Sequence, residues 1–174
     1  MKVILRKICE KDGSYIVKWR NSDHVKEHCI DKKQVTLASN MDYFENKIST
    51  GECIQYVVER MDEEYGVFSY PIGTIYLKNL DYTNKKCELG FFPSDDEEWN
   101  DESKKMAVDQ LLEKVFGEFD FHKVYVCVLA DCEDELDLFY KAGFKKEGIL
   151  LHEIKTEQGT YKDIVRLYAL DDRL

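Results

Sequence analysis

The densest group of chemically capable side chains in this sequence is a run of carboxylates. Six acidic residues lie between Asp95 and Glu102, with no basic residue among them. Carboxylates are the ligands that Ca²⁺ and Mg²⁺ prefer, but the run lacks the alternating spacing and the glycine of an EF-hand loop, so no metal is predicted there. Two interpretations stay open: a solvated acidic loop, and a docking surface for a basic partner or a polyamine-like substrate.

Histidine and cysteine side chains predict no metal centre either. His24 and His28 are four residues apart and would share a helical face near Cys29, but no second ligand cluster follows at useful spacing. The six cysteines include no Cys-x-x-Cys pair. We expect them to be reduced, buried side chains of an intracellular protein.

Composition describes the domain that must position these groups. The chain has 174 residues, 44% of them hydrophobic and 13% aromatic, which predicts one domain over residues 1–174 with a sizeable core. The formal charge of −10 argues against nucleic acid or an anionic membrane as a partner. The apolar run Val3–Leu5 is too short for a signal peptide and no stretch approaches a membrane span, so we expect a cytoplasmic protein.

Hydrophobic periodicity predicts strands and helices in mixed order. The predicted strands are Val3–Leu5, Ile54–Met61, Ile72–Leu80, Cys87–Phe92, His122–Leu129, Phe144–Lys155 and Tyr161–Leu170. The predicted helices are Glu10–Asn21, Thr36–Ser49, Val108–Phe119 and Glu133–Ala142. The apolar face of the second helix would consist of Leu37, Met41, Phe44 and Ile48. This order fits a mixed α/β or α+β domain.

Several motifs, in their order and spacing, carry a family likeness. They are Leu5-Arg6 with Trp19-Arg20-Asn21; Pro71–Leu77, Asp81–Lys86 and Glu88–Phe91; and His122–Tyr125, Ala130-Asp131, Gly143-Phe144, Glu147-Gly148 and Gly159–Asp163. Together they resemble the GNAT superfamily of acyl-CoA-dependent N-acetyltransferases, most of all the branch that acetylates ribosomal-protein N-termini and amino sugars. The resemblance implies a mixed, mostly antiparallel sheet of about seven strands flanked by helices.

The resemblance also implies acetyl-CoA as co-substrate. In the family, the strands matching Cys87–Phe92 and His122–Leu129 splay apart, and the pantetheine arm pairs with the exposed backbone like an added strand. The diphosphate lies at the N-terminus of the next helix, where free amides favour an anion. The implied cofactor-binding residues are Leu89, Gly90, Phe91, Phe92, Ser103, Lys104, Lys105, Cys132 and Phe139.

Three positions on the cofactor side depart from the family pattern. The glycine-rich diphosphate loop corresponds to Trp99–Lys104, which contains no glycine. An asparagine that holds the cofactor arm is replaced by Cys132, which we expect to be inert because its acidic neighbours raise the pKa of a thiol. The tyrosine that protonates the leaving thiolate is replaced by Phe139, which has no proton to donate, and Tyr140 faces about a hundred degrees away on the helix.

The resemblance assigns catalytic and acceptor roles as well. Glu88 matches a glutamate proposed as the base that deprotonates the amine through water, and its alternative role is a solvent-facing strand acid. Backbone amides of Leu89–Phe92 would polarise the thioester carbonyl, and Tyr140 or solvent would serve the thiolate. The acceptor-side residues would be Trp19, Asn21, His152, Tyr161 and Asp163. Their alternative roles are a core tryptophan, a helix end, a surface imidazole and cross-strand pairing.

Two functions follow from the sequence. The first is an N-acetyltransferase that moves an acetyl group from acetyl-CoA to a primary amine of an amino sugar, a protein N-terminus or an amino acid. The second is a catalytically reduced GNAT-fold binding module, supported by the three departures and the acidic run. Monomer and homodimer both stay open. Acetyl-CoA binding, measured as a thermal shift, separates the two functions.

Overall fold

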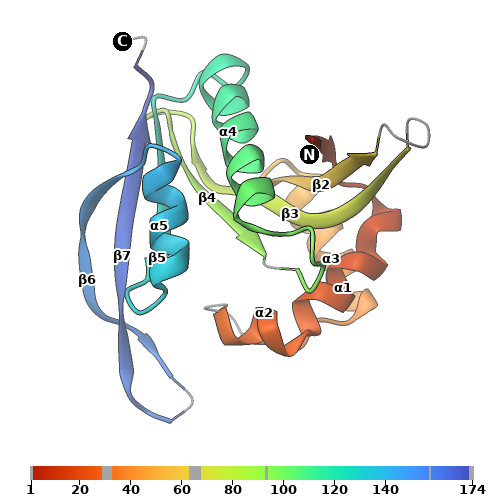
Figure 1. The fold of residues 1–174 in the computed structure, drawn as a ribbon, viewed down its shortest axis with the longest axis horizontal. Helices are drawn as coiled ribbons and strands as arrows, with labels where there is room; N and C mark the ends of the chain where they lie inside the picture. Colours follow the sequence, from red (N-terminus) through yellow and green to blue (C-terminus); the bar gives the residue numbers. More distant parts are fainter. Residues whose placement is uncertain (1, 29–32, 63–67, 93, 157, 173–174) are drawn as a thin grey trace.

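The computed structural model describes residues 2–172, apart from 29–32, 63–67, 93 and 157 (Figure 1). Its centre is a seven-stranded sheet in the order β1-β2-β3-β4-β5-β7-β6. The strands are β1 (Lys2–Lys7), β2 (Ile54–Asp62), β3 (Phe68–Asp81), β4 (Lys86–Phe92), β5 (Lys123–Leu129), β6 (Lys145–Lys155) and β7 (Tyr161–Leu170). Neighbouring strands are antiparallel except β4 and β5, which run parallel. The expected mixed, mostly antiparallel sheet is confirmed.

Helices flank this sheet in two groups. They are η1 (Glu10–Asp12), α1 (Gly13–Asn21), α2 (Asp23–His28), α3 (Leu37–Tyr43), η2 (Phe44–Ile48), α4 (Asp101–Gly117) and α5 (Glu133–Lys141). Figure 1 shows α1, α2 and α3 together, apart from α4 and α5. Among the described helices, none is both long and apolar enough to cross a bilayer.

The core lies between the sheet and α4. The helix buries its apolar stripe, including Ala107, Val108, Leu111 and Val115, all 0% exposed. The opposing strand residues include Leu77, Leu89 and Val124 from β3, β4 and β5. Alternate residues of a strand point to opposite faces, so Cys87 and Leu89 face α4 while Glu88 and Gly90 face the other side. This alternation decides which side chains reach the site described below.

The N-terminal helices differ from the prediction. Helix α2 was not predicted, because six mostly polar residues carry no apolar periodicity. Helix α3 begins at the predicted end, where Thr36 accepts a hydrogen bond from the Ser39 amide, but it buries none of its residues. The expected apolar face is only partly present: Phe44 and Ile48 are half-buried, but Leu37 is 62% exposed and Met41 is 36% exposed. The side of the helix that approaches α1 carries Asn40, close to Gly13.

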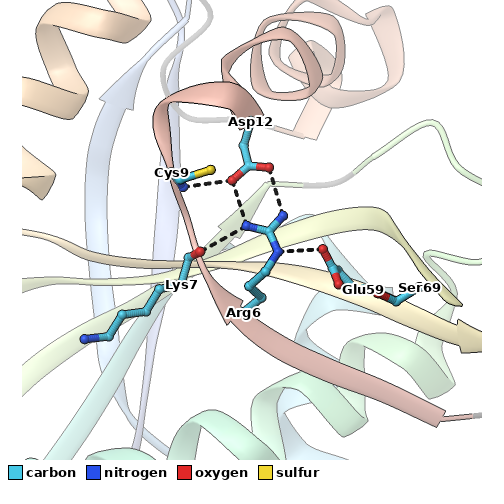
Figure 2. Close-up of polar contacts among 6 residues, drawn as sticks. All are labelled: Arg6, Lys7, Cys9, Asp12, Glu59 and Ser69. Atoms are coloured by element: carbon cyan, nitrogen blue, oxygen red, sulfur yellow. Dashed lines mark hydrogen bonds and ion pairs between the residues drawn. The ribbon is translucent and has the colours of Figure 1, made fainter. Parts of the chain in front are cut away.

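A partly buried charged cluster joins β1 to η1 and to the β2–β3 hairpin (Figure 2). The Arg6 guanidinium donates two hydrogen bonds to Asp12, at 2.8 and 3.0 Å, and one to Glu59 Oε1 at 2.6 Å. Asp12 also accepts from the Cys9 amide, and Glu59 accepts from the Ser69 hydroxyl. Burial raises the pKa of Asp12, but hydrogen bonds from Arg6 and Cys9 outweigh it and hold that pKa below its ordinary value.

The described cysteines are free thiols, as expected. Cys53 and Cys87 are buried, and burial raises the pKa of Cys87 to about 12. Cys9 is exposed, which corrects the expectation that all six are buried, because it lies at the loop end that caps η1. Cys29 lies outside the described residues.

Candidate active site

The parallel strands β4 and β5 separate along their length. Their pairing covers three positions only, from Lys86 opposite Lys123 to Glu88 opposite Tyr125. Beyond these, β4 continues to Phe92 paired with β3, and β5 continues to Leu129 paired with β7. The gap that the resemblance implied is therefore present, and the inner edges of the described strands have no strand partner along it.

A cavity of ≈ 510 Å³ opens at this gap. Gap residues Leu89, Phe91 and Leu129 line one part of it. Another part lies against α1 and α3, whose Ile16, Arg20, Ser39 and Asn40 also line it. The cavity thus extends from the gap between β4 and β5 to helices α1 and α3.

Glu88 lies in this cavity in a fixed position. Its Oε1 lies 3.2 Å from Lys78 Nζ, and its Oε2 accepts a hydrogen bond of 2.7 Å from the Asn79 amide. Asn79 has a φ of 50° and lies at an irregularity in the β3–β4 register, which aims its side chain at β4. The Glu88 side chain is 13% exposed, so the carboxylate is both reachable and held.

Glu88 also acts on neighbouring groups that can ionise. Burial raises the pKa of Cys127, and the negative charge of Glu88 raises it further. The same two causes, in the same order, raise the pKa of Tyr125. Both groups stay protonated at neutral pH, so neither provides a thiolate or phenolate nucleophile beside Glu88.

Tyr76 on β3 lies across Gly90 on β4. A Cβ at position 90 would lie 2.5 Å from the Tyr76 hydroxyl, closer than real contacts allow. Glycine at this position therefore lets the phenol ring lie against the strand, and both residues line the cavity.

Backbone amides at the N-terminus of α4 are capped by the side chain of the residue that precedes the helix. The Asn100 side chain accepts from the amides of Glu102 and Ser103, each at 3.1 Å. The Ser103 hydroxyl donates to backbone carbonyls, and the side chain is fully buried. Lys104 pairs with Asp101, and Lys105 pairs with Asp109. The three residues predicted here to bind a diphosphate are thus engaged within the protein.

Two residues of the acidic run form ion pairs with basic side chains from distant elements. Lys18 of α1 lies 3.6 Å from Asp95, and Arg60 of β2 lies 2.8 Å from Glu98. Trp99 anchors the run, being 5% exposed and packed over Gly73. Part of the charge that the run carries is therefore balanced locally, which the sequence did not predict.

The other cofactor-side positions have different environments. Phe139 is fully buried, and Tyr140 is 44% exposed and lies outside the described lining of the cavity. Cys132 is the N-cap residue of α5 and makes no capping bond through its side chain. Burial raises the pKa of its thiol, and Glu135 and Asp131 raise it further, in line with the predicted inert thiol.

The predicted acceptor residues do not come together. Trp19 is 3% exposed in the core. Asn21 ends α1 and binds the backbone of Val35 through both a donated and an accepted hydrogen bond, which fixes a segment of the cavity wall. His152, Tyr161 and Asp163 lie at another hollow of ≈ 360 Å³, which the β6–β7 hairpin forms with Ala130 and Asp131 after β5. An irregular register between Leu150 and Ile154 and the bond from the His152 amide to Asp163 explain this placement.

Several lining residues were missed by sequence reasoning. They are Tyr43, Gln55, Tyr76 and Lys78. Lys78 has no simple sequence signal, because Asp81 pairs with Lys86 and an unshifted hairpin would place Asn79 opposite Glu88. An irregularity between Lys78 and Asp81 places Lys78 there instead. Tyr43 and Gln55 come from distant elements and have no local signal either.

The described residues contain no group of three His, Cys, Asp or Glu side chains placed to hold a metal ion. Of the His24, His28 and Cys29 set considered from the sequence, Cys29 lies outside the described residues, and so do the side chains of the two histidines.

Comparisons with a family model, a known protein and solved structures all match this chain to acetyltransferases. Residues 2–145 match the family model described as Acetyltransferase (GNAT) domain. Spermidine N(1)-acetyltransferase of Vibrio cholerae is 19% identical over 172 residues, covering 99% of this chain and 95% of that protein. The crystal structure of the V. cholerae spermidine N-acetyltransferase with CoA and spermine superposes with a TM-score of 0.85, at 21% identity, over 97% of this chain and 95% of the other. A chimera of that enzyme with hSSAT gives 0.79 at 20% identity, over 98% and 96%.

Proposed function

The chain belongs to the GNAT acetyltransferase family, and from this premise we propose that it transfers the acetyl group of acetyl-CoA to a primary amine. The observation that carries the proposal is the single cavity that joins the β4–β5 gap to Glu88. A two-substrate transfer needs a donor and an acceptor held face to face, and this cavity provides room for both.

The chain's own residues supply the arrangement. Acetyl-CoA, when bound, contributes an acetyl group activated as a thioester. The edge of β4 that faces the gap along Leu89–Phe92 lies where an extended arm would add as a strand, and the amides on this edge polarise the carbonyl. Glu88, held by Lys78 and Asn79, accepts the proton of the amine through water. Solvent, rather than the exposed Tyr140, supplies the proton for the leaving thiolate.

The gap between β4 and β5 suits the pantetheine arm of CoA, but the start of α4 differs from a glycine-rich diphosphate site. Asn100 occupies amides at the start of α4, and Asp101 and Glu102 add negative charge beside them. A diphosphate at this helix end would displace the Asn100 cap or bind beyond it. We therefore expect weaker CoA binding than a glycine-rich loop would give.

The acceptor amine is a small molecule in this proposal. The V. cholerae relative is named for spermidine, and its crystal structure holds spermine. Amino sugars, amino acids and protein N-termini are the other amines that the sequence suggested. The binding-module alternative is not proposed, because the gap and a positioned Glu88 are both retained.

Thermal shift and thiol release test the function together. Acetyl-CoA at a hundred times its dissociation constant should stabilise the protein by about 2.7 kcal/mol. Glu88→Gln should keep this shift and lose most thiol release in the presence of an amine mixture, since a general base contributes about 10²–10⁴-fold. Glu113→Gln, on an exposed face of α4, is the matched control. No shift at millimolar acetyl-CoA would reject the proposal.

A further inference from the structure

Two oppositely charged side chains that line the cavity, Lys78 and Glu88, form an ion pair, and this pair indicates the class of amine. Lys78 and Glu88 are register partners on β3 and β4, and both line the cavity. Their charged atoms are 3.2 Å apart. The pair presents one positive and one negative group to the cavity.

Such a pair is complementary to a zwitterion. In an α-amino acid, one carbon carries both the ammonium and the carboxylate, so the two charges lie side by side as Lys78 and Glu88 do. The ammonium then faces Glu88 and the carboxylate faces Lys78, with each charge near its opposite. A polyamine has no group for Lys78, and its ammonium next to Glu88 would also lie near that lysine.

The charges of the other described lining residues also favour an amino acid over a polyamine. Three cationic residues line the cavity, namely Arg20, Lys33 and Lys78, against two acidic residues, Glu88 and Glu135. Each further ammonium of a polyamine would need a carboxylate partner, because an unpaired charge in a partly buried site is costly. Neutral donors and acceptors such as Gln55 and Asn40 instead suit the uncharged or carboxylate parts of an amino acid.

We propose that the acceptor is a free α-amino acid, acetylated on its α-amino group; this inference rests on the proposed acetyl transfer. The amide bond forms between the amine nitrogen and the acetyl carbon, and the thioester C–S bond breaks. Because the acceptor enters as an ammonium, its nitrogen loses two protons. The first passes through water to Glu88 before the attack, and the second goes to solvent as the amide forms. The thiolate takes a proton from solvent.

Matched acceptors test the proposal. The twenty amino acids, their carboxamides and spermidine are compared by kcat/KM for thiol release, and products are identified by mass spectrometry. The best amino acid should exceed its own carboxamide about tenfold, which corresponds to about 1.4 kcal/mol. Lys78→Gln should abolish this ratio, and Lys78→Glu should favour spermidine. Because the ratio is taken within one variant, any change in the Glu88 base cancels.

Lys86→Gln is the control, since Lys86 lies on β4, is as exposed as Lys78 at 43%, and lies outside the described lining. It should keep the wild-type ratio. Binding is measured separately, as the thermal shift that each acceptor adds in the presence of CoA. If spermidine exceeds every amino acid, or if Lys78→Gln leaves the ratio unchanged, the amino-acid acceptor is wrong while acetyl transfer stands. If acetyl-CoA neither binds nor reacts, the proposed function fails and this inference fails with it.

Discussion

Phe139 of α5 stacks on Phe91 of β4, with ring centroids 5.6 Å apart and ring planes inclined by 24°. Phe91 also contacts Trp99 edge-on, and Phe139 contacts Phe144 in the same manner. These rings connect the strand on one side of the gap with the helix that follows the strand on the other side. The ring at position 139 therefore packs α5 against the β4 side of the gap.

Truncating this ring should destabilise the fold. We expect Phe139→Ala to lower the free energy of unfolding by about 3–5 kcal/mol, because the fully buried ring leaves a cavity behind. Urea unfolding measures the effect. Leu151→Ala, at a side chain 71% exposed, is the control and should change stability little. Equal effects for the two variants would contradict the supporting role of Phe139.

Removing charge at the start of α4 should strengthen CoA binding. The double variant Asp101→Asn, Glu102→Gln keeps the shapes of both side chains while removing two negative charges beside the Asn100 cap. Titration calorimetry with CoA should give a lower Kd, and the gain should shrink as salt rises. Glu113→Gln, further along the same helix, should leave Kd unchanged. An unchanged Kd in the double variant would show that these acids do not oppose the diphosphate.

Tyr140 should be dispensable for turnover. Its side chain is 44% exposed and lies outside the described cavity lining, so Tyr140→Phe should retain kcat and its pH profile. Loss of a general acid would instead cost about 10²–10⁴-fold. Steady-state kinetics from pH 6 to pH 9 decide between these outcomes, and a loss of that size would restore Tyr140 as the proton donor.

The Arg6–Asp12 pair should make stability depend on pH. The folded-state pKa of Asp12 lies below its ordinary value of 3.8, so its contribution is complete above that pH and is lost as pH falls through the folded-state pKa. Asp12→Asn should therefore be less stable than the wild type at pH 7, by about 1–3 kcal/mol, since a hydrogen bond between charged groups is replaced. Urea unfolding from pH 7 to pH 2 should show the difference narrowing below pH 4. A difference independent of pH would contradict the assigned pKa.

Most of the fold followed from local sequence patterns. Helix α4 and strand β5 match the helix predicted over Val108–Phe119 and the strand predicted over His122–Leu129, because their apolar patterns are strong. Helix α3 carries an equally regular apolar stripe, yet Leu37 is exposed. The way α3 packs on α1 depends on tertiary contacts, which periodicity alone does not determine.

The site was predicted less completely. Glu88 was named from the sequence, and the structure places it in the cavity, but its partner Lys78 depends on strand register. The predicted acceptor role of His152 stays a prediction, and the structure places this residue at a hollow other than the cavity that holds Glu88, beside an irregular hairpin register. Register and irregularities are set by contacts across strands, which a single sequence encodes only weakly.

Three residue pairs between β4 and β5 are all that join the two halves of the sheet by strand pairing within the described chain. Strand pairing is therefore shortest at the centre of the sheet, between β1–β4 on one side and β5–β7 on the other. A molecule bound along the gap would contact both halves and add hydrogen bonds where the strands have none between them. Amide hydrogen exchange in Leu89–Phe92 and Val126–Leu129 should then slow together when acetyl-CoA binds.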